Sequence, residues 1–146
     1  MELVLFCGLQ GAGKTSFYQE HFAATHVPIS MDMLKTRKRE KAILLACLQS
    51  GQRCVVDNTN PTAAERAVYV QAARNNHFAV IGYHFEVPLS VCLARNASRE
   101  GKARISEAGL YAVAAKLSPP QMHEGFARIY SVDAGGEARL MVTGAS

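Results

Sequence analysis

A glycine-rich segment close to the N-terminus constrains the fold of this chain more than any other feature. Residues 8–15 read Gly-Leu-Gln-Gly-Ala-Gly-Lys-Thr, a full match to the phosphate-binding pattern Gly-x-x-x-x-Gly-Lys-[Ser/Thr]. The segment directly follows an apolar run at residues 3–7, which is typical of a buried strand. In this pattern the backbone N–H groups turn inward around a phosphate, and the next helix presents its positive end to the same anion. The motif therefore predicts a strand, a phosphate-binding loop and a helix in that order.

The side chains of the motif predict a site for ATP and Mg²⁺. The lysine of such loops reaches the β- and γ-phosphates and the hydroxyl holds the metal, so these roles are expected of Lys14 and Thr15. The other predicted nucleotide contacts in the loop are Gly8, Gly11, Ala12 and Gly13.

The rest of the chain alternates between strand and helix patterns. Strands are predicted at residues 3–7, 27–30, 53–57, 78–85 and 126–132, and helices at 15–24, 34–49, 60–76, 88–96 and 107–117. Two helix starts compete in the third helix, Asn60-Pro61 and the capping box Thr62-x-x-Glu65. The alternation predicts an α/β fold, with a parallel sheet covered by helices on both faces and a ligand beyond the carboxyl ends of the strands. One domain over residues 1–146 is expected, with no assignment for the tail after residue 135.

Composition excludes several classes of protein. With 49% hydrophobic and 19% charged residues, a disordered chain is excluded. The apolar stretch at residues 42–48 is too short to cross a bilayer, and the N-terminus carries no basic leader, so we expect no membrane partner and a cytoplasmic location. The four cysteines form no Cys-x-x-Cys pair and are expected to be buried, and the five scattered histidines predict no metal site made of protein groups alone. The net charge of +4 decides nothing by itself.

Motifs of other nucleotide-binding classes are missing from the sequence. It contains no Asn-Lys-x-Asp run that would read guanine, and no Leu-Ser-Gly-Gly signature of transporter ATPases. The third predicted strand ends in Asp57-Asn58-Thr59-Asn60, without the Asp-Glu pair that positions water in motor ATPases. These differences favour a small kinase that transfers a γ-phosphoryl group to a hydroxyl.

Two aspartates that follow predicted strands are candidates for the chemistry of transfer. A kinase needs a carboxylate near the acceptor hydroxyl and an acidic or polar group near the metal. Asp32 follows the second strand and suits the first role, although aspartate is also a common helix N-cap. Asp57 follows the third strand and suits the second role, although it could instead shape a turn.

Two groups of basic residues suggest contacts with phosphates. Arg95, Arg99 and Arg104 lie in or beside a polar segment where a closing lid is expected, at about residues 95–106. A second group crowds the start of a predicted helix, where positive charge is unfavourable, and consists of Lys35, Arg37, Lys38, Arg39 and Lys41. Glu40 offsets part of this charge, and a solvated helix face remains an alternative for both groups.

Several of these runs together resemble the kinase domain of polynucleotide 5′-hydroxyl kinases. The matching runs are Gly8–Thr15, Ser30-Met31-Asp32, Val55–Pro61 with Arg66 and Tyr69, the lid-like Ala94–Lys102, and Glu124-Gly125-Phe126. They span residues 1 to about 132. No Asp-x-Asp-x-Thr phosphatase motif accompanies them, so the resemblance covers a kinase module only.

The resemblance implies roles for individual residues. It implies an adenylate-kinase-like fold with the first strand central, Asp32 as the base for a 5′-hydroxyl, and Asp57 beside the metal and the acceptor. It also implies that Arg95 and Arg99 contact ATP phosphates from the lid, and our own hypothesis is that Arg99 acts at the γ-phosphoryl group. Lys35 falls where phage-type enzymes carry an arginine near the acceptor's 3′-phosphate, and a lysine there keeps the charge without the bidentate fork.

Three functions stay open on the sequence. The first is a kinase acting on the 5′ end of a nucleic acid. The second is a kinase with the same catalytic groups that acts on a small-molecule hydroxyl, as in a sugar, nucleoside or antibiotic. The third is a protein that binds ATP without transferring phosphate, although binding alone requires neither Asp32 nor lid arginines. The sequence specifies no oligomeric state and no residue that stacks on adenine.

Overall fold

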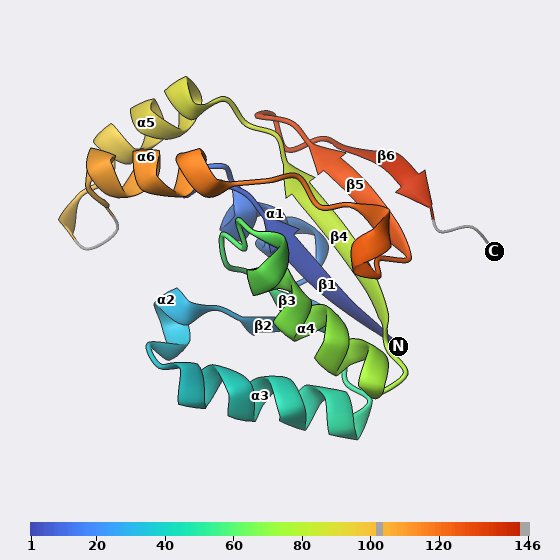
Figure 1. The fold of residues 1–146 in the computed structure, drawn as a ribbon. Helices are drawn as coiled ribbons and strands as arrows, with labels where there is room; N and C mark the ends of the chain where they lie inside the picture. The colour runs from blue at the N-terminus through green and yellow to red at the C-terminus, as the bar shows by residue number, and fades with distance from the viewer. Residues whose placement is uncertain (102–103, 144–146) are drawn as a thin grey trace.

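The computed structural model describes residues 1–101 and 104–143 and is built on a six-stranded sheet (Figure 1). In spatial order the strands are β2 (Val27–Ile29), β3 (Cys54–Val56), β1 (Glu2–Cys7), β4 (Ala79–Phe85), β5 (Arg128–Val132) and β6 (Ala138–Thr143). The first five pair in parallel and β6 pairs antiparallel with β5. The predicted parallel sheet with a central first strand is confirmed, and an antiparallel edge strand is added to it.

Side chains of β1 alternate between two apolar clusters, one on each face of the sheet. Leu3 and Leu5 pack with residues of α3 (Arg37–Ser50) and α4 (Ala63–Asn75). Val4 and Phe6 pack with α1 (Lys14–His21), α5 (Leu89–Ala97) and α6 (Glu107–Lys116). Because successive strand residues point to opposite faces, the apolar run at residues 3–7 of β1 requires helices on both sides. Figure 1 shows α5 and α6 side by side beyond the carboxyl ends of the strands.

The helix predicted over residues 34–49 is α3, which begins at Arg37, and a separate short helix precedes it. A four-residue helix, α2 (Met31–Leu34), ends at Lys35, whose φ of 72° lies in the left-handed region and breaks the helical path. Thr36 then caps α3, since its hydroxyl accepts a hydrogen bond from the Arg39 N–H at 3.1 Å. Ser30 is the N-cap of α2, so the interpretation of Asp32 as an N-cap was wrong.

Of the two predicted starts of α4, the structure uses Thr62 as the N-cap, although only the Thr62 half of the predicted capping box forms. The Thr62 hydroxyl accepts a hydrogen bond from the Glu65 N–H and donates one to its carboxylate. Asn60-Pro61 therefore does not begin the helix. Asn60 has a positive φ of 44° and donates from Nδ2 to the Phe6 carbonyl oxygen at 2.7 Å. This bond ties the loop after β3 to the end of β1, next to the phosphate-binding loop.

A buried ion pair joins two of the runs that resemble polynucleotide kinases. Arg66 on α4 is fully buried, and its Nε and Nη2 donate to the Glu124 carboxylate at 2.8 and 3.0 Å. Glu124 ends the short 3₁₀ helix η2 (Met122–Glu124), and Gly125 follows with a φ of 113°. A Cβ on Gly125 would lie 2.8 Å from Val70 Cγ1, so this position requires glycine. Arg66 also donates to the Asn60 carbonyl oxygen, so the pair supports the loop after β3.

The tail that the sequence left unassigned forms a turn and the edge strand β6. The Asp133 carboxylate accepts hydrogen bonds from the N–H groups of Gly135 and Glu137 and so shapes the turn. In β6 three consecutive apolar residues, Leu140, Met141 and Val142, are exposed. An apolar run without alternation gives no strand-versus-helix signal, which explains why the pattern was weak.

All four cysteines are buried and free, as predicted. In the part of the chain that the structure describes, no helix has the length and apolar character needed to cross a membrane.

Candidate active site

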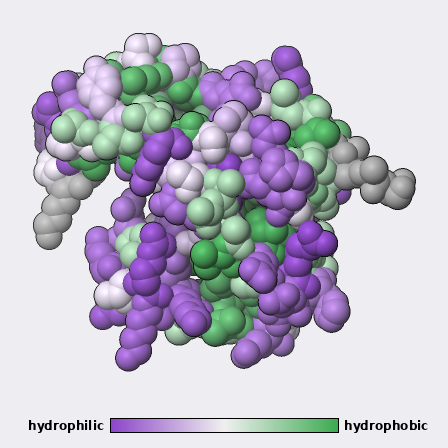
Figure 2. All heavy atoms as spheres, in the orientation of Figure 1, coloured by the Kyte–Doolittle hydropathy of each residue, from purple (hydrophilic) through white to green (hydrophobic). Residues whose placement is uncertain are grey.

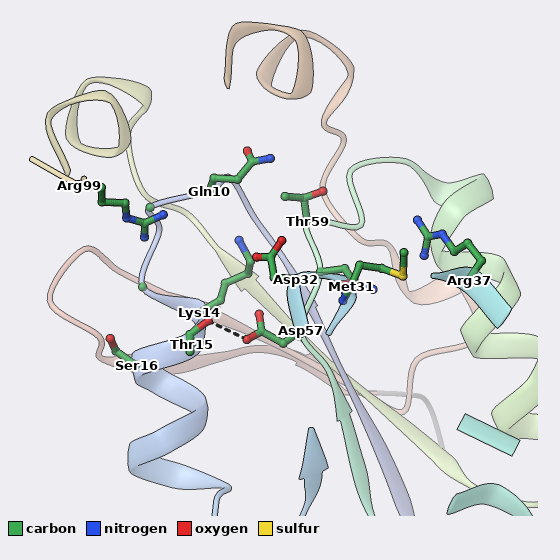
Figure 3. Close-up of a pocket in the computed structure, with 13 residues that line it drawn as sticks. Gln10, Lys14, Thr15, Ser16, Met31, Asp32, Arg37, Asp57, Thr59 and Arg99 are labelled. Carbon is green, nitrogen blue, oxygen red and sulfur yellow. Dashed lines mark hydrogen bonds between the residues drawn. The ribbon is translucent and has the colours of Figure 1, made fainter. Parts of the chain in front are cut away.

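A cavity of about 250 Å³ opens at the carboxyl ends of β1 and β3, between α2 and the residues that follow α5 (Figure 3). It is lined by Gln10, Gly11, Gly13, Lys14, Thr15, Ser16, Met31, Asp32, Arg37, Asp57, Asn58, Thr59 and Arg99. We call it the transfer cavity. Of the predicted site residues, it brings together Lys14, Thr15, Asp32, Asp57 and Arg99. The molecular surface is hollowed between the lobe of α5 and α6 and the polar lobe of α2 and α3 (Figure 2).

The phosphate-binding loop has the backbone that its glycines predict. Gly11 and Gly13 have positive φ values of 82° and 93°, which residues with a side chain rarely adopt. Gly8 is required for space, because a Cβ there would lie 2.7 Å from the Cβ of Phe85. The Gly8 N–H donates to the Thr59 carbonyl oxygen at 3.0 Å, which joins the loop to the segment after β3.

Lys14 is buried at the base of the loop. Its Nζ donates hydrogen bonds to the carbonyl oxygens of Gly8 at 2.9 Å and Leu9 at 2.7 Å. Burial lowers the pKa of Lys14 from 10.5 to about 8, an effect that the nearby Asp57 carboxylate partly opposes. The ammonium is thus held by weakly basic carbonyl oxygens, in a position where an anion would stabilise its charge.

Thr15 and Asp57 place two oxygen atoms side by side in the transfer cavity. The Thr15 hydroxyl donates to Asp57 Oδ2 at 3.0 Å, shown as a dashed line in Figure 3. Burial raises the pKa of Asp57, while the Lys14 charge and the Thr15 hydrogen bond lower it. Hydroxyl and carboxylate oxygens suit Mg²⁺, which usually keeps waters and substrate phosphates as its other ligands. Among residues 1–101 and 104–143 no group of three or more His, Cys, Asp or Glu could hold a metal ion, so such an ion would need those other ligands.

Asp32 reaches the transfer cavity from α2. It is exposed. Its negative charge opposes the lowering of the Lys14 pKa and adds to the rise of the Asp57 pKa, so the three groups lie within electrostatic range of one another. The backbone at the start of α2 is held from the neighbouring strand, because the Met31 N–H donates to Asn58 Oδ1 at 3.0 Å. Asn58 directly follows Asp57, so one short segment positions both carboxylates.

Glu40 on α3 is a buried carboxylate that sequence reasoning missed. Glu40 is 5% exposed, and its Oε2 accepts from Asn58 Nδ2 at 2.8 Å. Its Oε1 accepts from Arg37 Nη1 at 2.8 Å and from the Tyr69 hydroxyl at 2.9 Å. Burial is the largest cause, and the hydrogen bond to Glu40 the next, of a rise in the pKa of Tyr69 to about 12. We call Glu40, Asn58, Tyr69 and Arg37 the Glu40 network. The available signal was a single acidic residue within a basic run, three residues after Arg37.

Arg95 lies on α5 and Arg99 lies two residues after its end, and both border the phosphate-binding loop. Arg99 lines the transfer cavity, on the side opposite Arg37 (Figure 3). Arg95 donates from Nη1 to the Gly11 carbonyl oxygen at 3.0 Å and from Nη2 to the Ala134 carbonyl oxygen at 2.7 Å. Arg104 and Lys35 line neither this cavity nor the neighbouring one described next. Lys102, the last residue of the lid-like run, lies outside the described residues, as does residue 103.

A second cavity, of about 290 Å³, adjoins the phosphate-binding loop on its other side. It is lined by Gly11, Ala12, Gly13, Ser16, Phe17, Glu20, Phe85, Arg95, Arg99, Ala134, Gly135 and Gly136. The turn between β5 and β6 thus forms one wall, which sequence reasoning missed. The Gly135-Gly136 pair predicts a turn, but only the sheet order brings that turn beside the loop.

Comparison with known proteins shows both sequence and structural relatives. Residues 32–120 match the family described as AAA domain, a range that begins after the phosphate-binding loop. The chain is 21% identical over 135 residues to a bifunctional polynucleotide phosphatase/kinase of Schizosaccharomyces pombe, covering 90% of this chain and 33% of that protein. It is 30% identical over 78 residues to a putative bifunctional polynucleotide phosphatase/kinase of Acanthamoeba polyphaga mimivirus, covering 53% of this chain and 18% of that protein.

A solved structure shares the fold across nearly the whole chain. A sugar kinase from Janibacter sp. HTCC2649 superimposes with a TM-score of 0.70 at 18% identity, covering 92% of this chain and 86% of that one. The fold is therefore that of P-loop kinases. The resemblance to polynucleotide kinases predicted from the motifs is confirmed in sequence, although the chain spans a third or less of those two relatives.

Proposed function

The chain belongs to the AAA domain family that its residues 32–120 match, and on this premise we propose that it is an ATP-dependent kinase. It transfers the γ-phosphoryl group, with Mg²⁺, to a hydroxyl, and the preferred acceptor is the 5′-hydroxyl of a polynucleotide. The observation that carries the proposal is the transfer cavity, where a buried lysine, a hydroxyl–carboxylate pair, a second carboxylate and an arginine line one space. A site that only held ATP would not need Asp32.

ATP lies across the two cavities, which share Gly11, Gly13, Ser16 and Arg99. Its phosphates lie in the phosphate-binding loop, where Lys14 exchanges the carbonyl oxygens of Gly8 and Leu9 for phosphate oxygens. The nucleoside end lies in the second cavity, against Arg95 and the turn between β5 and β6. This arrangement points the γ-phosphate toward Asp32.

In the transfer step, an oxygen of the acceptor hydroxyl attacks the γ-phosphorus. The bond between that phosphorus and the β–γ bridging oxygen breaks, ADP leaves, and the hydroxyl proton passes to the Asp32 carboxylate. Lys14 and Arg99 face the negative charge on the phosphoryl oxygens from two sides. We assign the lid to residues 95–106, with Arg95 and Arg99 as its contacts to ATP, and expect it to exclude water when closed.

Thr15 and Asp57 are the residues that would hold Mg²⁺. Their oxygen atoms lie 3.0 Å apart in the transfer cavity, beside Lys14, and both are hard donors of the kind that this ion prefers. The ion would neutralise phosphate charge.

Two observations favour a polynucleotide as the acceptor. The matched relatives in Schizosaccharomyces pombe and mimivirus are named polynucleotide phosphatase/kinases. The start of α3, next to the transfer cavity, also exposes five basic residues, which are Lys35, Arg37, Lys38, Arg39 and Lys41. A polyanion would be attracted to such a surface.

A small-molecule hydroxyl is the second candidate acceptor. The observation that favours it is the close structural similarity to a sugar kinase over most of both chains. The two candidates differ in salt dependence, because a polyanion that contacts several basic residues loses affinity steeply as salt rises, whereas a neutral sugar does not.

The decisive experiment follows label from γ-labelled ATP. A 5′-hydroxyl oligonucleotide competes with a panel of sugars and nucleosides as acceptor, with Mg²⁺ present, for wild-type protein and for Asp32→Asn. We expect label on the oligonucleotide, a loss of transfer in Asp32→Asn of about 10²- to 10⁴-fold, and unchanged ATP binding in that variant.

Other outcomes of this experiment would correct the proposal in specific ways. Label on a sugar or nucleoside keeps the transfer chemistry and changes the acceptor. Loss of ATP binding in Asp32→Asn makes Asp32 structural. ATP binding without any transfer by the wild-type protein indicates a non-catalytic binding protein.

A further inference from the structure

We propose that Arg37, and not Lys35, binds the acceptor's own phosphate, and that the adjoining acceptor nucleoside lies in a third cavity on α4. This inference rests on the proposed function, since it presumes an acceptor that carries a phosphate near the reacting hydroxyl. It names a subsite and the residue that decides between phosphate-bearing and neutral acceptors.

The third cavity, of about 220 Å³, continues the transfer cavity away from the phosphate-binding loop. It is lined by Arg37, Glu40, Asn58, Thr59, Asn60, Pro61, Glu65, Val68 and Tyr69. Three of these residues, Arg37, Asn58 and Thr59, also line the transfer cavity and form the rim between the two spaces. An acceptor whose hydroxyl reaches Asp32 would therefore extend past Arg37 into the third cavity.

Arg37 is held in place along one edge and open along the other. Its Nη1 donates to the buried Glu40 carboxylate at 2.8 Å and to the Tyr69 hydroxyl at 3.0 Å. The side chain is nevertheless 69% exposed, and Figure 3 shows it across the transfer cavity from Arg99. An arginine fixed in this way loses little conformational freedom on binding, and its remaining N–H groups retain the planar geometry that suits a phosphate.

The other basic residues around the start of α3 lack this placement. Lys35 and Lys38 are exposed and line neither the transfer cavity nor the third cavity. Arg39 Nη1 donates to the Leu34 carbonyl oxygen at 3.3 Å, which directs it toward the end of α2. Among the described residues on the shared rim, Arg37 is the one cation.

The third cavity combines apolar surface with few charges, which suits a sugar and a base. Val68, which is 65% exposed, and the mostly buried Pro61 both line this cavity. The Glu65 carboxylate at the edge is engaged elsewhere, since it accepts from the Thr62 hydroxyl and lies 3.8 Å from Lys116 Nζ. The hydroxyl of Thr59 on the shared rim adds a neutral polar group toward a phosphate or ribose.

The test compares two acceptors that differ by a single phosphate. Steady-state transfer is measured to a nucleoside 3′-monophosphate and to the same nucleoside without phosphate. Wild-type protein is compared with Arg37→Ala, Arg37→Lys and Lys35→Ala, and Lys38→Ala is the matched control for loss of one exposed charge. We expect Arg37→Ala to raise the KM for the phosphorylated acceptor about 10- to 100-fold, because a charge-assisted hydrogen bond is lost. The KM for ATP should stay within about twofold of wild type. Transfer to the neutral nucleoside should fall much less than transfer to the phosphorylated acceptor, so that the preference for the phosphate is lost, and Arg37→Lys should be intermediate.

A second pair of variants tests the third cavity itself. Val68→Glu places a negative charge in the cavity, whereas Ala67→Glu places the same charge one residue away on the exposed surface of α4. We expect Val68→Glu to weaken use of the phosphorylated acceptor about tenfold through repulsion, and Ala67→Glu to have little effect. Melting curves and the KM for ATP show whether each variant is folded.

The possible failures of the inference and of the proposed function are distinguishable. If wild-type protein transfers label to the nucleoside 3′-monophosphate but Lys35→Ala impairs this more than Arg37→Ala, the inference is wrong and the proposed function stands. The same holds if Val68→Glu and Ala67→Glu behave alike. If wild-type protein shows no preference for the phosphorylated acceptor or for oligonucleotides, the inference and the polynucleotide acceptor both fall, whereas the kinase activity stands if label reaches a sugar or nucleoside.

Discussion

The two sides of the transfer cavity are held together in different ways. On the phosphate side, one continuous loop of eight residues wraps around Lys14, which donates to two carbonyl oxygens of the loop itself. Thr59 and Arg95 add one hydrogen bond each to the backbone of this loop. On the acceptor side, Asp32 lies on an exposed four-residue helix that ends at a residue in the left-handed region. That helix is anchored to Asn58, 27 residues away, and through it to the Glu40 network.

This difference means that the two sides should respond differently to mutation. The phosphate side depends largely on the positive φ values of Gly11 and Gly13 and on the Lys14 hydrogen bonds within the loop, so changes in the Glu40 network should leave it intact. The acceptor side depends on side chains from α3, α4 and the end of β3, because Glu40 joins Arg37, Asn58 and Tyr69. A variant in the Glu40 network should therefore impair the acceptor side alone, and three measurements can break or sharpen this contrast.

The largest effect is expected from Arg99, which lines the transfer cavity and which we propose acts on the γ-phosphoryl group. Arg99→Ala should lower kcat about 10³-fold or more, as for arginines that stabilise transferring phosphoryl groups. The measurement is single-turnover transfer at saturating ATP and acceptor. Arg53→Ala, an exposed arginine before β3, is the control for loss of one charge. A loss of tenfold or less would remove Arg99 from this role.

An intermediate effect is expected from Glu40. The two carboxylate oxygens of Glu40 accept hydrogen bonds from three donors, on Arg37, Asn58 and Tyr69. In Glu40→Gln an amide N–H₂ group replaces one of these oxygens. This group cannot accept, so at least one of the hydrogen bonds is lost and the N–H₂ group faces another donor. We expect kcat to fall about 10- to 100-fold while the KM for ATP stays unchanged. Steady-state kinetics with ATP and acceptor varied separately distinguishes the two sides.

The matched control for Glu40→Gln is Glu107→Gln, at an exposed position in the first turn of α6. It makes the same chemical change without a network and should behave as wild type. If Glu40→Gln weakens ATP binding as strongly as it weakens transfer, the two sides are not independent.

The smallest effect is a pH dependence that belongs to the phosphate side. Burial lowers the pKa of Lys14 to about 8, and bound phosphates favour the charged form, so the pKa rises when ATP binds. Protein without nucleotide loses the Lys14 proton above that pH, and binding must then restore it. ATP affinity should fall up to about tenfold between about pH 7 and pH 9, with proton uptake on binding.

Calorimetric titration in buffers of different ionisation enthalpy measures this proton uptake directly. Acceptor binding at constant ATP saturation should not follow the same curve, because Lys14 contacts the nucleotide alone. An ATP affinity that stays flat to pH 9 would show that Lys14 does not titrate in this range.

The sequence alone determined the phosphate side and the class of fold. The pattern Gly8–Thr15 specifies its own conformation, since glycines at Gly11 and Gly13 permit the positive φ that an inward-facing loop requires. The apolar runs likewise predicted a doubly covered parallel sheet, because strands buried on both faces need no alternation. Asp32 and Asp57 were predicted as site residues because each follows a strand and the ligand lies beyond the carboxyl ends of parallel strands, and both line the transfer cavity.

Only the tertiary structure decided how the acceptor side is built. The burial of Glu40 and the approach of the β5–β6 turn to the phosphate-binding loop both depend on partners distant in sequence. A pattern of residue types shows which side chains prefer burial or a turn, but not which distant donor will reach a given acceptor. In the sequence, Glu40 looks like an ordinary surface carboxylate. One of its partners, Arg37, is three residues away, but Asn58 and Tyr69 lie far along the chain. These groups meet only when α3 and α4 pack on the same face of the sheet.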